Sequence, residues 1–417
     1  MSTLSTLPGE TSPGSTPASK LRMLFVDDEP AVLNVLKMGM RPMAAEWDMH
    51  FADSGKKALA LIEAQPFDVV ISDMRMPDMN GTQLLNHALQ RNPQTVRIIL
   101  SGYSDLRDVI SCVGLAHQFL HKPCSLVDLR DSLKRITSLN RQLHHDGLLT
   151  LTAQLTNVPS IPGQYLEMLD ALQSPTSSAQ RIADIASQDP ALSAKLLQLS
   201  NSAFFGFNRT FSSVDEAVQF LGVGVIQSLA LAVPLFSAFD RNKCPTFPVD
   251  QVWNHSVQTG MLARRFINEY LEDPPLAEQA FAAGVLHDIG QIILASGIPE
   301  TYTAILADAQ ARSEPLCQAE RRSLQTTHAE IGGYLLALWG LPFSLVDAVA
   351  YHHEPQKSQV TEFGLTGVIH IVNALQHEQA AHPGIVPDAV DLEYIHSIGM
   401  AGHLEKWRND LRTGAME

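Results

Sequence analysis

The sequence predicts two kinds of domain in one chain: a doubly wound α/β domain with a five-stranded parallel sheet, followed by an all-α helical bundle. Short apolar runs alternate with helix-like stretches between residues 22 and 124. Strand-like runs disappear after about residue 150, where helix-like segments bounded by prolines and glycines take over. The length of 417 residues leaves room for about two to four domains.

Five apolar runs are the expected strands of the first domain, at 22–27, 48–52, 67–73, 96–101 and 117–121. Helix-like stretches separate them. Pro30 suits the first turn of one helix, and Ser54 is a natural N-cap for another. Strand–helix units of this length imply a parallel sheet with helices on both faces. Leucines and isoleucines at helical spacing over 125–146 predict a last helix that runs into a connector.

Helices are expected throughout the second half, at 162–173, 179–188, 190–201, 214–221, 224–239, 249–271, 275–296, 299–312, 327–338 and 342–352. We therefore divide the chain into a tail (1–20), an α/β core (21–124), a last helix with connector (125–150), an all-α domain (151–355) and a helical extension (356–417). The tail is rich in Ser, Thr, Pro and Gly and poor in large apolar side chains, so we expect it to be disordered.

Composition narrows the function classes. The net charge of −15 argues against broad electrostatic binding to DNA or to a membrane. The four cysteines are scattered without paired spacing, which indicates reduced thiols. No secretory signal is visible, and the longest apolar stretch, 229–239, is too short to cross a bilayer and contains Pro234. We expect a cytoplasmic protein without a membrane partner, and the acidic balance makes DNA-binding regulation a weaker, third hypothesis.

Polar side chains stand where the expected strands end. Asp27 and Asp28 follow the first strand, Asp73 closes the third, Ser101 ends the fourth and Lys122 follows the fifth. The carboxyl ends of parallel strands meet at one edge of a sheet, so these groups should lie together. Asp27 and Asp28 can hold Mg²⁺ beside Asp73, whose carboxylate can attack phosphorus. Lys122 and the Ser101 hydroxyl can then bind phosphoryl oxygens, which predicts phosphoryl transfer onto Asp73.

A switch residue is expected on the last strand. Phe119 stands three residues before Lys122. It can swing inward when Ser101 moves toward a phosphoryl group, a local packing change with a distant effect. The first domain is therefore predicted to receive a signal.

Four motifs resemble the receiver domain of two-component response regulators, over residues 22 to about 140. They are Val26-Asp-Asp, Asp73-Met-Arg-Met-Pro-Asp-Met-Asn-Gly, Leu100-Ser-Gly and His121-Lys-Pro. The resemblance implies a flavodoxin-like sheet with Asp73 as phosphoacceptor. It also implies a Mg²⁺ site made by Asp27, Asp28 and Asp73 with the backbone carbonyl of Arg75. The implied partner is a sensor histidine kinase, and homodimerisation through the last strand and helices stays open.

An unusual set of histidines marks the second half: His255, His287 (next to Asp288), His328, His352 and His353. His255 shares a helical stripe with apolar residues, so it should face the core. A His–Asp pair inside an apolar helix is costly to bury unless a metal or a hydrogen bond satisfies it. Imidazoles and carboxylates from several helices are also what helical bundles use to hold transition metals.

The order of these residues resembles the HD superfamily of metal-dependent phosphohydrolases, and residues 151 to about 355 resemble an HDOD domain within it. The supporting motifs are Pro159-Ser-Ile-Pro-Gly, the run that begins at Asp189-Pro-Ala-Leu, Leu286-His-Asp-Ile-Gly, Trp339-Gly-Leu-Pro and Tyr351-His-His. The resemblance implies a second metal site, with iron or manganese bound by the histidines and Asp288. Two departures stand out: Asn373 occupies the place of a later Asp ligand, and no Gly-Tyr-Pro follows the paired histidines.

Two functions therefore stay open. The favoured hypothesis is a response regulator in which phosphorylation of Asp73 controls a non-enzymatic HDOD output, acting on a downstream signalling protein through protein–protein contact. The alternative is a phosphorylation-regulated phosphohydrolase, in which a metal-activated water attacks a cyclic dinucleotide or another nucleotide. The histidines are correspondingly either metal ligands or hydrogen-bonded groups of a helical core.

Overall fold

The structure, a computed structural model, describes residues 20–92, 95–102, 116–122, 125–127, 129–130, 133–134, 159, 161–173, 178–200, 213–358, 362–379 and 389–413. The expected disordered tail and the connector after residue 134 lie almost wholly outside these ranges. Residues 126–127, 129–130 and 133–134 are helical, in the region of the expected last helix of the α/β domain.

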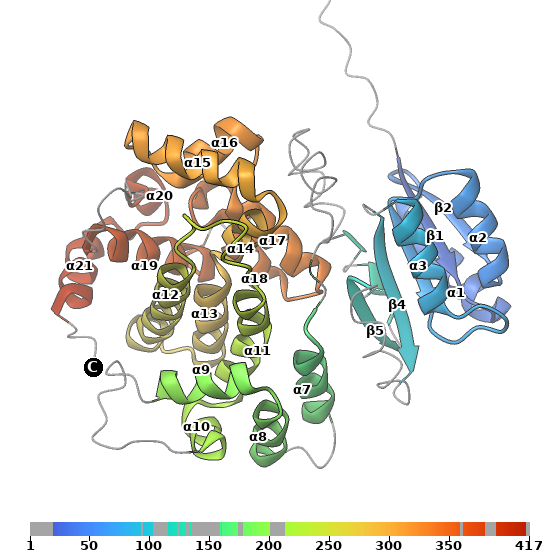
Figure 1. The fold of residues 1–417 in the computed structure, drawn as a ribbon, viewed down its shortest axis with the longest axis horizontal. Helices are drawn as coiled ribbons and strands as arrows, with labels where there is room; N and C mark the ends of the chain where they lie inside the picture. The colour runs from blue at the N-terminus through green and yellow to red at the C-terminus, as the bar shows by residue number, and fades with distance from the viewer. Residues whose placement is uncertain are drawn as a thin grey trace, which may run out of the picture.

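The α/β part contains the predicted five-stranded parallel sheet, seen at the blue end of the colour scale (Figure 1). Its strands are β1 (Leu21–Val26), β2 (Trp47–Ala52), β3 (Val69–Asp73), β4 (Val96–Gly102) and β5 (Gln118–Lys122). They lie in the order β2-β1-β3-β4-β5. The helices described between them are α1 (Pro30–Met40), α2 (Gly55–Ala64) and α3 (Gly81–Arg91), with a 3₁₀ turn η1 (Arg41–Met43). Each strand lies within two residues of its predicted bounds.

Local chemistry explains where the helices begin. Pro30 is the first residue of α1, and the Ser54 side chain accepts a hydrogen bond from the Lys57 backbone N–H at the start of α2. Asn80 and Gln83 form a reciprocal capping box at α3, which places Gly81 against the end of β3. All five residues of β3 are buried, as expected for a central parallel strand covered on both faces.

The second part is helical throughout its described residues. Its helices are α7 (Gly163–Gln173), α8 (Ala179–Ser187), α9 (Pro190–Ser200), α10 (Val214–Leu221), α11 (Val223–Ser237), α12 (Val249–Tyr270), α13 (Pro274–Leu286), α14 (Ile289–Gly297), α15 (Pro299–Arg312), α16 (Leu316–Leu324), α17 (His328–Leu338), α18 (Phe343–Tyr351), α19 (Leu365–Gln379), α20 (Leu392–Ser397) and α21 (Leu404–Thr413), with 3₁₀ turns η4 (Pro355–Lys357) and η5 (Ala401–His403). Nine of the ten predicted segments match a helix within two residues at each end.

Two features of this part differ from the prediction. The single helix expected over 275–296 is two helices, α13 and α14, with a turn at His287 and Asp288. The His287 ring bonds through Nδ1 to the carbonyl of Gly284, and Asp288 has non-helical backbone angles (φ −98°, ψ 8°). Helix α16 was not predicted, because its sequence LCQAERRSL is mostly polar. Both differences concern residues that line the site described below.

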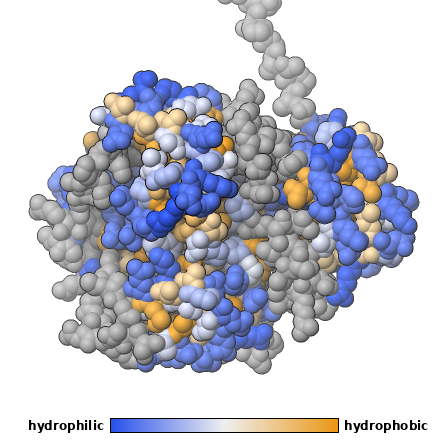
Figure 2. Space-filling model, viewed as in Figure 1, coloured by the Kyte–Doolittle hydropathy of each residue, from blue (hydrophilic) through white to orange (hydrophobic). Residues whose placement is uncertain are grey.

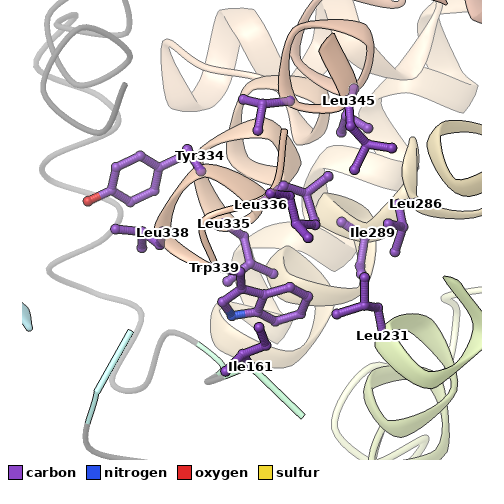
Figure 3. Close-up of a cluster of buried hydrophobic side chains, with 14 of the residues drawn as sticks. Ile161, Leu231, Leu286, Ile289, Tyr334, Leu335, Leu336, Leu338, Trp339 and Leu345 are labelled. Carbon is purple, nitrogen blue, oxygen red and sulfur yellow. The ribbon is translucent and has the colours of Figure 1, made fainter. Parts of the chain in front are cut away.

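Helix α17 is covered on every side, since all eleven of its residues are buried. Leu335, Leu336 and Trp339 pack against side chains of several other helices, including Leu231 and Ile289 (Figure 3). By contrast, the surface of both parts is largely hydrophilic where its described residues face the viewer in Figure 2.

Gly290 sets how closely α14 approaches α17. A Cβ atom at Gly290 would lie 1.9 Å from the carbonyl oxygen of His328, closer than any side chain allows. The first turn of α17 can therefore press directly on α14. The stretch Pro274–Gly297, which forms α13 and α14, is apolar enough to span a membrane by length and composition, but 78% of its most apolar window is buried inside the protein.

Candidate functional site

The first candidate site lies at the carboxyl edge of the sheet. The ammonium of Lys122, at the end of β5, donates to the Asp27 carboxylate over 2.8 Å and also to Asp73 Oδ1. The backbone N–H groups of Glu29 and Arg75 donate to Asp27 Oδ1 and Asp73 Oδ2, respectively. The three strand ends thus bring two carboxylates and one ammonium together, as the sequence predicted.

Burial shapes the charges at this edge. Asp27 is 0% exposed and Asp73 is 8% exposed. Burial raises the pKa of Asp73, the Lys122 ammonium opposes that rise, and the nearby Asp27 adds to it. For Lys122, burial alone would lower the pKa, but the bonds to Asp27 and Asp73 outweigh it and raise the pKa. The half-buried Asp28 adds a third carboxylate. Such an excess of hard oxygen ligands suits Mg²⁺.

The other predicted residues of this site are placed by their backbone. Arg75 lies at the site through its backbone N–H, which donates to the Asp73 carboxylate. Ser101 lies in β4, and Phe119 lies in β5. The side chains of Ser101 and Phe119 are outside the described part of the chain, so the predicted switch movement stays a prediction.

The second candidate site is a cluster of histidines around Asp288. The Nε2 atoms of His328, His287 and His352 lie 3.1, 3.3 and 3.9 Å from Asp288 carboxylate oxygens. His353 Nε2 lies 2.8 Å from His328 Nε2. These residues come from the α13–α14 turn, the start of α17 and the end of α18, so tertiary packing assembles the cluster.

The cluster contains two overlapping groups with the geometry of metal sites. In the first, donor atoms of Asp288, His328, His352 and His353 all lie within 4.8 Å of one another. The second joins His255, His287 and Asp288 within the same limit. Asp288 belongs to both groups, so each of its two carboxylate oxygens can bind a metal ion in a different group.

Two buried ring nitrogens test whether a metal ion fits. His287 and His352 bond through Nδ1 to the carbonyls of Gly284 and Val349, respectively. Their Nε2 atoms are buried and have no hydrogen-bond partner among the described residues. A metal-binding histidine usually donates one ring N–H to a backbone carbonyl or carboxylate and keeps its other nitrogen for the metal. The residues therefore fit a transition metal such as iron or manganese.

Glu320 of α16 is a member of the site that the sequence did not reveal. It is 0% exposed, and its Oε2 accepts bonds from both the backbone N–H and the Nδ1 of His328, over 2.8 and 2.7 Å. Its Oε1 accepts a bond from the Tyr302 hydroxyl over 2.7 Å. Glu320 thus fixes the His328 ring so that Nε2 points at Asp288. A Glu in a charged helix gives no sequence signal of this role.

The electrostatics of the cluster are uneven. Burial would lower the pKa of His328, but the carboxylates of Glu320 and Asp288 outweigh it and raise the pKa to about 10. Burial and the neighbouring histidines hold the pKa of His352 well below its usual value. The pKa of Asp288 is also held far below its ordinary value, because His287 and His328 outweigh its burial. The cluster therefore combines a cationic histidine with neutral ones.

Asn373 of α19 reaches the cluster through His255. Its side-chain oxygen lies 2.8 Å from His255 Nε2, and burial lowers the pKa of His255 to about 3. The His377 ring lies 4.5 Å from the His255 ring, a contact that the sequence did not indicate. Helix α19 belongs to the predicted helical extension, yet it completes this side of the cluster.

Two family models match the chain. A model described as the response regulator receiver domain matches residues 23–134. A model described as the HDOD domain matches residues 158–355. The first match covers the sheet-edge site, and the second covers every residue of the histidine cluster except those on α19.

Individual proteins are similar to parts of the chain. The chain is 29% identical over 208 residues to an uncharacterized protein of Treponema pallidum (strain Nichols), which covers 49% of this chain and 39% of that protein. It is 35% identical over 114 residues to the response regulator protein PilR of Pseudomonas aeruginosa, covering 27% of this chain and 25% of PilR. The chain thus spans less than half the length of either relative. The signal receiver domain of an HD domain-containing protein from Pseudomonas fluorescens Pf-5 is 30% identical, with 28% of this chain and 93% of that domain covered and a TM-score of 0.27.

Proposed function

Because this chain carries a response regulator receiver domain followed by an HDOD domain, we propose that phosphorylation of Asp73 controls the HDOD domain, which acts on a downstream protein by direct contact. The observation that carries the proposal is the position of Asp73, which shares the Lys122 ammonium with Asp27 at the sheet edge. A phosphoryl group on Asp73 adds negative charge beside Lys122, the last residue of β5. It therefore changes the ion pairs that tie the end of β5 to Asp27 and Asp73.

The phosphate source in this proposal is a sensor histidine kinase, and a small phosphodonor with Mg²⁺ can replace it in the test. Incubation with acetyl phosphate and Mg²⁺, followed by intact mass spectrometry, should show one added phosphoryl group on the wild-type protein. Asp73→Asn should show none. Asp78→Asn is the matched control, because Asp78 lies in the same loop, is exposed, and has a positive φ of 66° that Asn tolerates. Equal labelling of Asp73→Asn and wild type would contradict the assignment.

The output is proposed to be binding rather than catalysis. Asn373 stands where the HD resemblance leads us to expect an Asp ligand, and it bonds to His255. His328, another expected ligand, is held between Glu320 and Asp288. Asn373 is a neutral amide and so a poorer ligand than a carboxylate. A metal ion would also have to displace the His328 proton before it could bind there. Both features weaken the set of metal ligands.

A metal-dependent phosphohydrolase is the second candidate, supported by the buried Nε2 atoms of His287 and His352 that converge on Asp288. A transition metal there would supply Lewis-acid chemistry for a phosphate ester. A nucleotide panel that includes cyclic dinucleotides, assayed with Mn²⁺- or Fe²⁺-loaded protein, tests it. His287→Ala should abolish turnover while the exposed-site control His396→Ala keeps it. No turnover by the loaded wild type would remove this candidate.

A further inference from the structure

Helix α17 has a different neighbour at each end. Its first residue, His328, belongs to the histidine cluster through Asp288 and Glu320. Its other end is followed by Gly340, which lies against a residue of the receiver sheet, Gln118. One helix of eleven residues, about 16 Å long, therefore joins the cluster to the receiver domain.

The receiver side of this contact is a covered sheet edge. Strand β5 is the last strand of the sheet, where backbone and side chains would ordinarily meet water. Yet Arg97, His117 and Gln118 are only 4%, 3% and 3% exposed. Arg97 is held in place by bonds to the Thr95 carbonyl and to the His117 ring. Arg97 lies on β4 beside the edge strand and His117 just before β5, and polar side chains buried this deeply there indicate that another part of the protein packs over them.

The HDOD side of the contact comes from the end of α17. Gly340 has a φ of +75°, and a Cβ atom there would lie 2.3 Å from Gln118 Nε2, so the Gln118 side chain fills the space beside the glycine. Tyr334 is close enough to oppose the fall in the pKa of Arg97, which burial lowers to about 10. Figure 3 shows Tyr334 and Leu338 on the side of α17 away from Leu286 and Ile289.

Packing near Gly340 leaves little freedom. The Trp339 indole N–H donates to the carbonyl of Pro159 over 3.0 Å, which ties this end of α17 to the chain that enters the HDOD domain. Gln118 Oε1, however, is buried without a hydrogen-bond partner among the described residues. An unpaired buried oxygen is costly, so the contact is tight but not strongly favourable. A contact of this kind between the receiver and HDOD domains can separate at a small cost in free energy.

We propose that the Gln118–Gly340 contact couples the two sites: receiver phosphorylation moves β5, opens this contact and loosens α17 at the histidine cluster. Lys122, which bonds to Asp27 and Asp73, ends the same five-residue strand that begins at Gln118. A strand and a fully buried helix thus connect Asp73 to His328, and close-packed elements transmit displacement rather than absorb it. The inference rests on the proposed function, since it requires a receiver that is phosphorylated at Asp73.

Hydrogen–deuterium exchange of the full chain tests the coupling. Beryllofluoride with Mg²⁺, a phosphoryl mimic, should raise exchange several-fold in peptides covering 334–341 as well as change exchange around Asp73 and Lys122. Asp73→Asn should abolish both effects. A change confined to the receiver peptides would overturn the coupling and leave the proposed function intact. No change in any peptide would count against the proposed function itself.

A pair of glycine variants isolates the contact. Gly340→Ala should raise exchange in 334–341 even when no mimic is added, because the new methyl group displaces Gln118. Gly399→Ala is the matched control: its φ is +74°, the residue after it also bonds back to a helix carbonyl, and no heavy atom lies within 4 Å of the new methyl group.

In the double variant Gln118→Ala/Gly340→Ala, exchange in peptides 334–341 should fall back to that of Gly399→Ala. The reason is that the side chain with which the new methyl group clashes has been removed. Strictly additive effects of Gln118→Ala and Gly340→Ala would show that the residues do not touch in solution and would overturn the inference. Should Gly340→Ala fail to fold, Gln118→Ala alone still decides the question. The proposal requires that it reduce the response of α17 to beryllofluoride while the receiver peptides respond as in wild type.

Discussion

Replacement of Glu320 by Gln removes one charge from a fully buried network while keeping the shape of the side chain. Glu320 accepts bonds from the Tyr302 hydroxyl and from both the backbone N–H and the ring of His328. The amide can accept at its oxygen only, so the cationic His328 ring loses its strongest partner. Breaking a buried ion pair by removing one member costs about 3–5 kcal/mol. We expect about 3 kcal/mol for Glu320→Gln, because Asp288 still faces the other side of the ring.

Urea unfolding at 25 °C measures this cost, and about 3 kcal/mol corresponds to a more than hundredfold change in the folding equilibrium. The same change at an exposed pair, Glu405→Gln, is the control. The Glu405 side chain is 79% exposed and its pairing with Arg408 should contribute less than about 1 kcal/mol. A loss of stability for Glu320→Gln no larger than that of Glu405→Gln would refute the account of Glu320 as a buried charge partner.

The pH dependence of the Glu320→Gln effect follows from His328. Its pKa is raised in the folded protein from 6.5 to about 10. A raised pKa means that the ion pair stabilises the fold fully below pH 6.5 and that this contribution is lost as the pH rises toward 10. The difference in unfolding free energy between wild type and Glu320→Gln should therefore be largest near pH 6 and shrink steadily between pH 6.5 and about 10, by roughly 1.4 kcal/mol per pH unit at most.

Three further outcomes test other parts of the structure. Asn80→Ala should lower receiver stability by about 1 kcal/mol in thermal unfolding, since it removes the capping box with Gln83, and a loss below about 0.3 kcal/mol would contradict that role. Gly290→Ala should unfold the HDOD domain or cost more than about 3 kcal/mol, because its Cβ would meet the His328 carbonyl, whereas Gly402→Ala, with open space around it, should cost less than about 1 kcal/mol. The apparent affinity for Mn²⁺, measured by calorimetry, should rise with pH because the metal must displace the His328 proton, and a pH-independent affinity would exclude His328 as a ligand.

The sheet-edge site was predictable from sequence because parallel strands impose a rule that local patterns can satisfy. Apolar runs mark the strands, and the residue after each run must lie at the common edge. Asp27, Asp73 and Lys122 therefore came together as predicted. The same reasoning could identify Ser101 and Phe119 only by their strands, since the position of a side chain within an edge depends on packing.

The histidine cluster was only half predictable. The family resemblance indicated the histidines and Asp288, but nothing in the sequence indicated the turn at His287–Asp288, which has neither glycine nor proline to mark it. Glu320 was hidden because five of the nine residues of α16 are polar, so no helix was expected there. The role of Glu320 depends on a helix–helix contact, and no local pattern encodes such a contact.

The placement of Glu320 also bears on how the cluster responds to its surroundings. His328 is held by Glu320 on one side and Asp288 on the other, and its backbone is the first turn of α17. Rotation or sliding of α17 therefore changes the distance between His328 and both carboxylates at once. Glu320 lies on α16 and Asp288 at the α13–α14 turn, so neither carboxylate is part of α17 itself. A movement of α17 would accordingly alter the charge balance of the buried cluster.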